Sequence, residues 1–320
     1  MKRICVLTSG GDAPGMNAAI RSILQYGIYK NLEIYGAIGG FNGLVKNKLI
    51  KLDVHDTVRI INGGGTILET LRCNEFRQKK GRKIAFETLK SHKIDGLIVI
   101  GGDGSFRGIK DLKKEWKFPC VGIPATIDND IAGTDMSIGT DTAINTALCA
   151  IDKIRDTSLS MTRVFVVEVM GRRSGYLASQ VALASAAEEM IIPEIKYDPH
   201  KLCAHIKEGR IRGKTSWIII VAEGAASANS IAKQISKQMS MEVRVAVLGH
   251  IQRGGSPTAF DRVLATKMGI VAVKALLKSD YGVAVGIKQR KLVTYDISKA
   301  VFESKKDTIK DSYKLLKTLL

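Results

Sequence analysis

Three carboxylates stand in two short turns, each directly after an apolar run. Asp103 follows Gly96–Ile100 within Gly-Gly-Asp-Gly-Ser, and Asp128 and Asp130 follow Cys120–Ile123 within Thr-Ile-Asp-Asn-Asp. Glycines let backbone N–H groups close on phosphate oxygens, and a carboxylate beside them can hold Mg²⁺. A further carboxylate can accept a proton from a hydroxyl nucleophile. The two turns together predict a phosphoryl-transfer site.

A third glycine-rich turn, at 8–17, follows the apolar run Arg3–Thr8 and precedes a predicted helix. It lacks the Lys-Ser/Thr of a Walker A loop, and Asp12 stands where a G-x-G-x-x-G loop needs glycine. Either the turn binds phosphate at a helix N-terminus, or it is a tight turn capped by Asp12. This segment alone does not decide between the two.

Several arginines lie at the ends of apolar runs or in glycine-containing turns, where they could hold phosphate oxygens in bidentate pairs. They are Arg72, Arg163, Arg172, Arg244 and Arg253. A single arginine is more often an exposed surface residue, but its place in a turn at a strand end favours a role in binding.

Strand-like and helix-like segments alternate along the chain. Strands are predicted at 3–8, 33–38, 96–100, 119–123, 163–169, 190–192, 217–222 and 244–248, and helices at 16–30, 83–92, 108–116, 139–155 and 175–188. This alternation predicts an α/β fold with a parallel sheet and right-handed crossovers. Because ligands in such folds bind at the carboxyl ends of strands, the turns above are all well placed.

The composition narrows the function further. The net charge of +18, from 49 Lys and Arg against 31 Asp and Glu, fits either nucleic-acid binding or a lysine-rich surface around small anions. No block reaches five or six like charges, which favours the second interpretation. The five cysteines are odd in number and form no C-x-x-C pair. This pattern disfavours disulfide bonds and a zinc site, and it favours a protein of the reducing cytoplasm. No apolar run approaches the roughly 20 residues of a membrane span.

Taken in order, these segments resemble the bacterial-type ATP-dependent 6-phosphofructokinases over nearly the whole chain. The matching motifs are T-S-G-G-D-A-P-G-M-N-A-A-I-R (8–21), I-G-G-D-G-S (100–105), T-I-D-N-D (126–130), V-E-V-M-G-R (167–172) and L-G-H-I-Q-R-G-G-S-P (248–257). The resemblance implies transfer of the ATP γ-phosphoryl group to the 1-hydroxyl of fructose 6-phosphate, the committed step of glycolysis. It also implies two Rossmann-like three-layer α/β/α domains with mostly parallel sheets.

The resemblance carries specific roles to individual residues. It makes Asp128 the general base, Thr126, Asp130, Arg172 and Gly11 the other catalytic positions, and Asp103 the Mg²⁺ ligand. Nucleotide-site positions are Gly11, Arg72, Cys73, Gly102, Asp103, Gly104, Ser105 and Gly108. Sugar-phosphate positions are Thr126, Asp128, Asp130, Met170, Gly171, Arg172, Glu223, His250 and Arg253, with Arg163 and Arg244 reaching the 6-phosphate from a neighbouring subunit.

The resemblance further implies a cytoplasmic homotetramer with shared active sites and with no nucleic-acid or membrane partner. The ATP-binding domain is expected at 1–138 plus 251–300, and the fructose 6-phosphate-binding domain at 139–250 plus 301–320. An effector site for ADP and phosphoenolpyruvate is expected at Arg21, Arg155, Glu188, Arg212 and Lys214. Gln25, Val54 and Arg59 depart from the usual Arg, Arg and Asp of that site, so we expect blunted or altered regulation.

The phosphoryl donor follows from two positions. Pyrophosphate-using relatives carry Asp where Gly104 stands and usually Lys where Ala125 stands. A carboxylate at 104 would crowd and repel the α-phosphate of ATP, so the sequence favours ATP, with pyrophosphate as the alternative. The remaining rivals are another kinase with a G-G-D-G-[ST] turn, a nucleic-acid-binding protein, and a catalytically silent relative. The T-I-D-N-D and G-H-I-Q-R-G-G segments speak against another kinase. Nucleic-acid binding leaves the carboxylate turns unexplained, and the presence of Asp103, Asp128, Asp130 and Arg172 together speaks against a silent relative.

Overall fold

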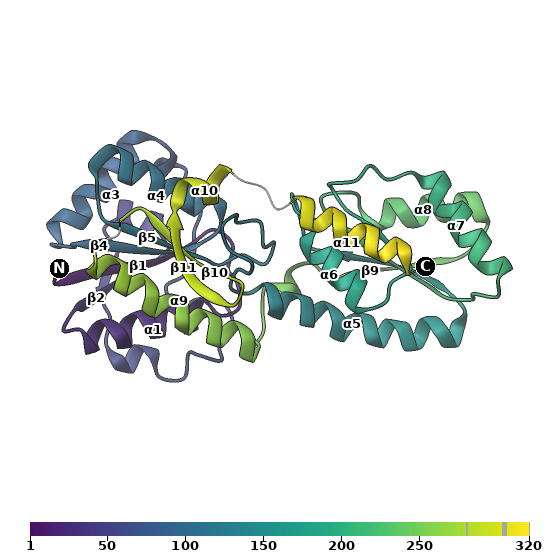
Figure 1. Cartoon of the computed structure of the whole chain (residues 1–320), viewed down its shortest axis with the longest axis horizontal. Coiled ribbons are helices and arrows are strands. Elements are labelled where there is room, and N and C mark those ends of the chain that lie inside the picture. Colours follow the sequence, from purple (N-terminus) through teal and green to yellow (C-terminus); the bar gives the residue numbers. More distant parts are fainter. Residues whose placement is uncertain (280, 303–305, 320) are drawn as a thin grey trace. The chain divides into compact units, whose positions relative to one another are not determined.

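The computed structural model describes residues 1–279, 281–302 and 306–319 (Figure 1). The chain divides into two compact units. The first unit comprises Met1–Ile127, Ile131–Thr142 and Arg253–Ser304, and the second comprises Asp128–Asp130, Ala143–Gln252 and Lys305–Leu320. Within the described residues, no helix combines the length and the hydropathy that a membrane crossing requires.

The first unit is built around a seven-stranded sheet in the order β11-β10-β5-β4-β1-β2-β3. Its strands are β1 (Arg3–Ser9), β2 (Glu33–Ala37), β3 (Leu49–Lys51), β4 (Gly96–Gly101), β5 (Cys120–Pro124), β10 (Val283–Lys288) and β11 (Lys291–Asp296). Its helices are α1 (Met16–Tyr29), α2 (Phe41–Val45), α3 (Lys79–Ser91), α4 (Asp103–Trp116), α9 (Ala259–Leu277) and α10 (Ile297–Phe302), with short 3₁₀ turns at Val54–Thr57 and Glu75–Arg77. Strands β2, β1, β4, β5 and β10 pair in parallel, while β3 and β11 close the edges in antiparallel pairs.

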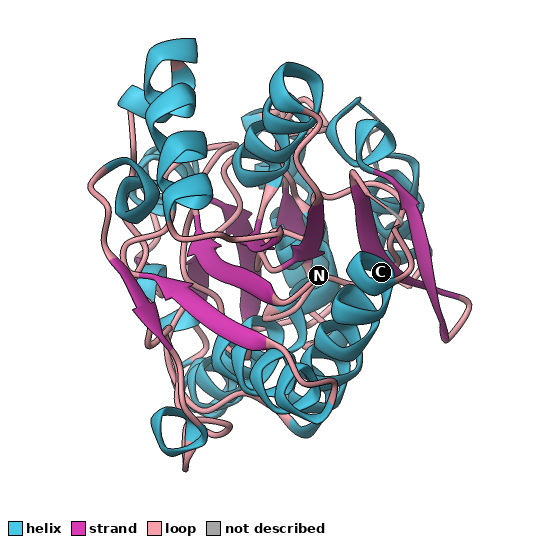
Figure 2. Ribbon diagram, turned by 90° about the vertical axis from the view of Figure 1, so that its left-hand side faces the viewer, coloured by secondary structure: helices cyan, strands magenta, loops and turns pink. Residues whose placement is uncertain are grey.

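Helices lie on both sides of this sheet (Figure 2). Every residue of β4 is therefore buried, as expected for a central parallel strand. On one side α1 and α9 lie against each other. Gly269 lets them approach, because a Cβ at this position would collide with the Ser22 hydroxyl. On the other side Phe106, Ile109 and Leu112 of α4 fill the core together with Leu97 and Val99.

The second unit holds a smaller sheet in the order β7-β8-β6-β9, with every pairing parallel. Its elements are β6 (Val164–Val169), β7 (Glu189–Ile191), β8 (Trp217–Ala222), β9 (Val243–Val247), α6 (Tyr176–Ala184), α7 (Pro199–Ile211), α8 (Ala228–Met239) and α11 (Lys306–Thr318), with a 3₁₀ turn at Gly249–Gln252. Helix α5 (Thr140–Met161) begins in the first unit and continues in the second. Strand β8 is buried along its whole length.

The predicted α/β class with mostly parallel sheets is confirmed. Four helix boundaries are wrong. The helix expected at 83–92 begins at Lys79. The helix expected at 108–116 begins at Asp103, because the glycine turn forms its first turn. The helix expected at 139–155 runs on to Met161 and ends before Thr162, whose φ is +50°. The helix expected at 175–188 ends at Ala184, two residues before Ala186, whose φ is +49°.

Candidate active site

Two glycine turns meet at the carboxyl edge of the first sheet. Strands β1 and β4 pair in parallel and end in register, with Ser9 opposite Gly101. The Ser105 hydroxyl donates to the Ser9 carbonyl over 3.1 Å and joins the two turns. A Cβ at Gly101 would collide with that same carbonyl, so only glycine permits this approach. The sequence-predicted phosphate turns are thus neighbours in space.

The second of these turns opens helix α4. Gly102 is its N-cap and offers no side-chain acceptor; its carbonyl accepts from the N–H groups of Ser105 and Phe106, which leaves the amides of Asp103 and Gly104 for a ligand. Gly104 is exposed, and a Cβ added there would meet nothing within 4 Å. The backbone of this helix start therefore presents N–H groups to open space, which is the arrangement that a polyphosphate needs.

Asp103 lies in the first turn of α4, and its carboxylate pairs with Arg107 one turn later, at 2.9 Å. No cluster of three or more His, Cys, Asp and Glu side chains able to hold a metal ion is found in the described part of the chain. Magnesium bound with a nucleotide takes only one or two protein carboxylates and fills its remaining positions with phosphate oxygens and water. A lone Asp103 beside a phosphate turn fits that donor set.

Arg253 lies against the first glycine turn. Its Nη1 donates to the Asp12 carbonyl over 3.1 Å, and a Cβ at Gly11 would collide with its guanidinium group. The resemblance assigned Arg253 to the sugar phosphate and Gly11 to catalysis. The structure brings the two together within the first unit, and this contact was not foreseen.

Thr126 follows β5 at the same sheet edge. Its carbonyl accepts hydrogen bonds from the Ser137 and Thr140 hydroxyls over 2.7 and 3.0 Å, and its N–H donates to the Ile138 carbonyl. A Cβ at Gly102 would lie 3.5 Å from the Thr126 Cβ. Thr126 therefore lies next to the start of α4, on a backbone fixed by hydrogen bonds.

Three further nucleotide-site candidates are placed differently. Gly108 is buried beneath the stacked rings of Phe41 and Phe76, whose centroids are 4.0 Å apart, and a Cβ there would press on both rings. Cys73 is partly buried against the same core, while Arg72 is exposed. Packing is thus sufficient to explain the glycine at 108, and the nucleotide role of these three residues stays a prediction.

Asp261 organises the neighbouring helix starts and was missed by the sequence analysis. Its buried carboxylate accepts hydrogen bonds from the Gly139 and Thr142 amides, over 2.9 and 2.8 Å, and from the Thr142 hydroxyl. Burial raises the pKa of this carboxyl, and the hydrogen bonds from Thr142 and Gly139 oppose that rise. One aspartate thereby ties the beginning of α5 to the beginning of α9.

In the second unit, two turns meet at the carboxyl edge of the smaller sheet. Val169 of β6 lies opposite Ala222 of β8, and the Gly224 N–H donates to the Gly171 carbonyl over 3.1 Å. Gly171 has a φ of +139°, which favours glycine. The predicted sugar-site residues Met170, Gly171, Arg172 and Glu223 are therefore brought together, and Arg172 and Glu223 are exposed.

Gln252 fixes a third turn beside these two. It is fully buried, and its Oε1 accepts from the Met170 N–H over 2.8 Å. The neighbouring turn also carries His250, whose side chain is exposed. Gln252 lay inside a motif that the sequence analysis quoted, but its positioning role depends on a hydrogen bond across 82 residues, which no sequence pattern reveals.

Asp128 is linked to the same group of turns. The Ser174 hydroxyl donates to the Asp128 carbonyl over 3.0 Å and accepts from the Tyr176 N–H over 3.3 Å. The segment that carries Asp128 and Asp130 is therefore attached to the turn that carries Arg172. Both carboxylates are partly buried.

Arg163 and Arg244 lie together at the opposite end of this sheet. Both pair with Glu242, at 3.4 and 2.5 Å, and Arg244 stands opposite Phe165 in the register of β6 and β9. The length of β6 separates Arg163 from Met170 by roughly 20 Å of extended chain. Within one chain, these two arginines do not reach the turns that carry the other sugar-site candidates.

The effector candidates are brought together only in part. Glu188 is buried, and its Oε1 pairs with Arg155 at 3.6 Å and with Lys214 at 3.1 Å. Arg212 is exposed and shares a small cavity of about 110 Å³ with Lys214. Arg21 lies on α1 of the first unit and the other four lie in the second unit.

Comparisons with known proteins agree with this geometry. A family model described as phosphofructokinase matches residues 3–276. An ATP-dependent 6-phosphofructokinase of Bacillus subtilis is 51% identical over 319 residues, covering 100% of this chain and 99% of the relative. One from Bacillus pumilus is 54% identical and covers 93% of each chain. The crystal structure of Pichia pastoris phosphofructokinase in the T-state gives a TM-score of 0.91 at 34% identity. The superposition covers 99% of this chain and 40% of the Pichia chain.

Proposed function

The chain belongs to the phosphofructokinase family, and we propose that it transfers the γ-phosphoryl group of ATP to the 1-hydroxyl of fructose 6-phosphate, a step of glycolysis. The observation that carries the proposal is the pair of glycine turns joined by Ser105 at the ends of β1 and β4. Two helices start from these turns, and their amides suit a polyphosphate. Identity of about half over the full chain supports ATP as the donor.

The open space at Gly104 also supports ATP over pyrophosphate. A carboxylate at this position would project where a Cβ meets no protein atom within 4 Å, beside the amides offered to phosphate. Such a charge would repel the α-phosphate of a nucleotide. Ala125 is buried and offers no cation. We therefore assign the nucleotide to the first unit, with Gly11, Gly102, Asp103, Gly104 and Ser105 around its phosphates.

Asp103 is the residue that would hold the magnesium ion of the nucleotide, and its salt bridge with Arg107 holds that carboxylate in place. When bound, the ion neutralises charge on the phosphate oxygens. The protein's remaining task is positioning, because phosphoryl transfer needs little covalent help.

We assign the proton transfer to Asp128. The 1-hydroxyl oxygen forms its bond to the γ-phosphorus while the bond from that phosphorus to the β–γ bridging oxygen breaks, and the hydroxyl proton passes to the Asp128 carboxylate. Ser174 holds the Asp128 backbone on the turn that also carries Arg172. That exposed guanidinium is available to stabilise the negative charge of the moving group.

The sugar phosphate is assigned to the second unit, at Met170, Gly171, Arg172, Glu223 and His250. Arg163 and Arg244 lie at the far end of the same sheet and therefore suit the site of a neighbouring chain rather than their own. This separation supports a homotetramer with shared active sites. An isolated chain would then lack two of the cations expected at its sugar-phosphate site.

Regulation is a second part of the proposal. Arg155 and Lys214 both bind the buried Glu188, so a phosphate entering this cluster competes with an existing carboxylate. Because Gln25 and Val54 stand where relatives carry arginine, two expected cations are lacking. We infer weakened control by ADP and phosphoenolpyruvate. A strong shift of the fructose 6-phosphate saturation curve by either compound contradicts this.

The test of the reaction measures fructose 1,6-bisphosphate formed from fructose 6-phosphate and Mg²⁺, with ATP and with pyrophosphate in parallel. We expect turnover with ATP alone. Turnover with pyrophosphate alone would preserve the sugar assignment and reverse the donor. No turnover with either would favour a kinase of different substrate.

A further inference from the structure

A cavity of about 440 Å³ lies in the second unit between β7, the start of α7, and α11. Its volume lies in the range of small-molecule sites. None of the residues assigned above to ATP, sugar phosphate or effector lines it. Its walls combine lysines and a histidine with tyrosine rings and aliphatic side chains.

The carboxylates of this cavity are already engaged. Glu189 is buried, and its Oε2 accepts from Lys317 Nζ at 2.5 Å and lies 3.6 Å from His205 Nδ1. The Asp198 carboxylate caps α7 by accepting the N–H groups of His200 and Lys201. Neither carboxylate is therefore left to repel an anion at full strength.

Two further lysines line the same cavity, and no carboxylate among the described residues neutralises them. Lys196 and Lys201 are exposed lining residues, and within the described residues neither forms a salt bridge. The charge of the cavity wall is consequently positive. A phosphate or carboxylate is the group that these ammonium ions suit.

The rest of the wall is apolar and partly aromatic. Ile192, Ile195 and Leu202 line it, together with the rings of Tyr197 and Tyr313. The Tyr197 hydroxyl donates to Gln234, which holds that ring in place. Burial raises the pKa of Tyr197 to about 12, so the ring stays neutral and presents no charge against an anion. A flat, apolar body suits such a surface.

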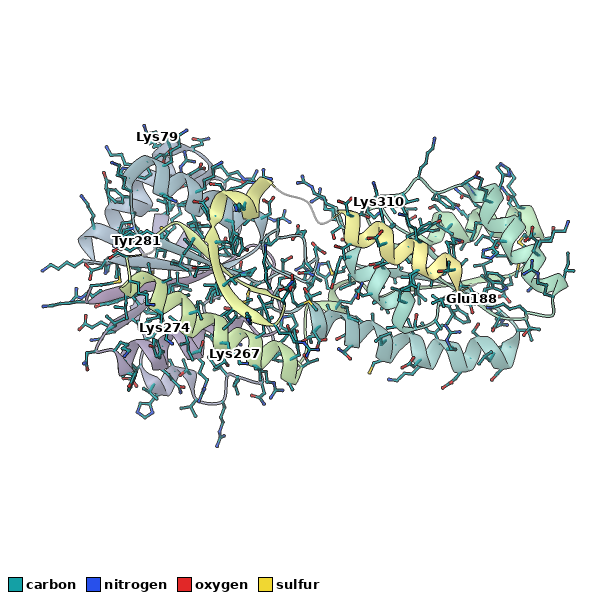
Figure 3. The ribbon with its side chains drawn as sticks, in the orientation of Figure 1. Lys79, Glu188, Lys267, Lys274, Tyr281 and Lys310 are labelled. Atoms are coloured by element: carbon teal, nitrogen blue, oxygen red, sulfur yellow. The ribbon has the colours of Figure 1, made fainter. Side chains whose placement is uncertain are left out.

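We propose that this cavity binds a small organic phosphate with a flat, apolar body, of up to mononucleotide size. The cavity is separate from the effector cluster, because Glu188 and Glu189 are consecutive and point to opposite faces of the chain. Glu188 pairs with Arg155 and Lys214, whereas Glu189 pairs with Lys317. Figure 3 labels Glu188, which belongs to the effector cluster, and Lys310, which lies on helix α11, the helix that forms one wall of the cavity.

Trp217 offers a built-in reporter of occupancy. The His205 ring lies edge-on to the Trp217 indole, with centroids 5.3 Å apart. His205 also lines the smaller cavity beside Arg212, so emission from Trp217 responds to either site and variants must distinguish them. The only other tryptophan, Trp116, belongs to the first unit and is removed by Trp116→Phe.

The experiment uses full-length Trp116→Phe protein with phenyl phosphate as the probe. Line broadening of its aryl protons in NMR measures binding directly, and Trp217 emission localises it. Inorganic phosphate lacks the apolar body and phenol lacks the charge. We expect each to bind at least about tenfold more weakly, because losing either contribution removes about 1.4 kcal/mol or more.

Three variants decide the location. Lys196→Ala with Lys201→Ala should weaken phenyl phosphate binding about tenfold or more. Lys233→Ala with Lys237→Ala on α8 removes the same charge away from the cavity and should change binding less than about twofold. Arg212→Ala tests the smaller cavity and should have equally little effect. The proposal is overturned by absence of saturable broadening up to about 10 mM probe, or by an equal loss in either control.

Discussion

Both units carry their candidate binding groups at the carboxyl edge of a sheet, but the groups differ in chemistry. In the first unit, glycines at 101, 102 and 104 bring bare backbone to the ends of β1 and β4, and Gly104 faces open space. In the second unit, the turns after β6, β8 and β9 present the exposed side chains of Arg172, Glu223 and His250. A polyphosphate is recognised well by amides alone, whereas a sugar phosphate needs varied side chains. In the proposed assignment, the edge of the sheet positions each site and the composition of the turns selects its ligand.

The largest expected effect comes from the carboxylate chemistry of the second unit. Asp128→Asn keeps the side-chain volume and removes the proton acceptor. We expect kcat to fall roughly 10²–10⁴-fold, the range for a lost general base, with the KM for fructose 6-phosphate changed far less. Steady-state kinetics measure both. Asp152→Asn, an exposed carboxylate on α5, is the matched control and should leave kcat unchanged. A nearly normal kcat in Asp128→Asn would remove the residue from this role.

The next effect tests the other end of the same sheet. Arg244→Ser removes one of the two guanidinium groups that share Glu242, and we expect the KM for fructose 6-phosphate to rise about 10–100-fold, as for lost charged hydrogen bonds. Arg210→Ser, an exposed arginine of α7, should have little effect. Unchanged sugar saturation in Arg244→Ser would separate this arginine from the site.

Mixing the two variants sharpens this test. If Arg244 serves a neighbouring chain, hybrid oligomers of Arg244→Ser and Asp128→Asn contain sites with both original residues. Random mixing then restores about a quarter of the original activity. If Arg244 served its own chain, every site would lack one of the two residues. No recovery in verified hybrids would therefore contradict the shared site.

The sequence predicted most of the central strands and the turns after them, because buried parallel strands are continuous apolar runs and their ends are marked by glycine. It missed the parallel strand β10, next to β5. It also missed the antiparallel edges β3 and β11, since Leu49–Lys51 is too short to give a pattern and β11 alternates only weakly. The start of α4 at Asp103 was also missed. Glycine has a low helix propensity, so the residue types here did not indicate a helix start. The hydrogen bond from the Ser105 hydroxyl to the Ser9 carbonyl, 96 residues away, helps to hold this first turn in place.

The candidate site, too, depends on contacts between residues that lie far apart in the sequence. Motifs identify Gly104, Asp128 and Arg172 because their residue types carry the chemistry. They do not identify Gln252 or Asp261, whose roles arise from hydrogen bonds to distant backbone atoms. Nor do they show that Arg163 and Arg244 share Glu242, which depends on the register between β6 and β9. The residues that we propose to contact ligands are readable from sequence, and the residues that hold them in place are not.

A smaller effect tests the backbone chemistry of the first unit. In Gly104→Ala the new methyl meets no protein atom within 4 Å, and alanine suits a helix better than glycine. We expect the free energy of unfolding to rise by about 0.5–1 kcal/mol while the KM for ATP rises about tenfold. Chemical denaturation and ATP saturation measure the two. An unchanged KM for ATP would show that the nucleotide does not use the space at Gly104.

The smallest effect distinguishes charged pairs that stabilise the fold from charged residues that bind substrate. In the first unit, Arg82 holds the Glu115 carboxylate through two hydrogen bonds, one of 2.9 Å from Nε and one of 2.5 Å from Nη2. The hydrogen bond from Arg82 lowers the pKa of Glu115 below its ordinary value, against an opposing effect of burial. A carboxyl whose pKa is lower in the folded state binds fewer protons there than in the unfolded chain. Its stabilisation is therefore complete above the unfolded pKa and is lost as pH falls through the folded pKa.

Glu115→Gln should consequently lower the free energy of unfolding by about 1–2 kcal/mol at pH 7. The difference should begin to shrink as pH falls below the ordinary glutamate pKa of about 4.3, and it should vanish only below the lowered pKa of the folded state. Denaturation curves recorded across this pH range measure it. Glu87→Gln, which removes an exposed pair with Lys83 at 3.8 Å, should cost only a few tenths of a kcal/mol at any pH. The KM for ATP should stay constant in both variants, because neither carboxylate lies in the glycine turns. A pH-independent loss in Glu115→Gln would mean that packing, and not the charge, is what Glu115 contributes to the first unit.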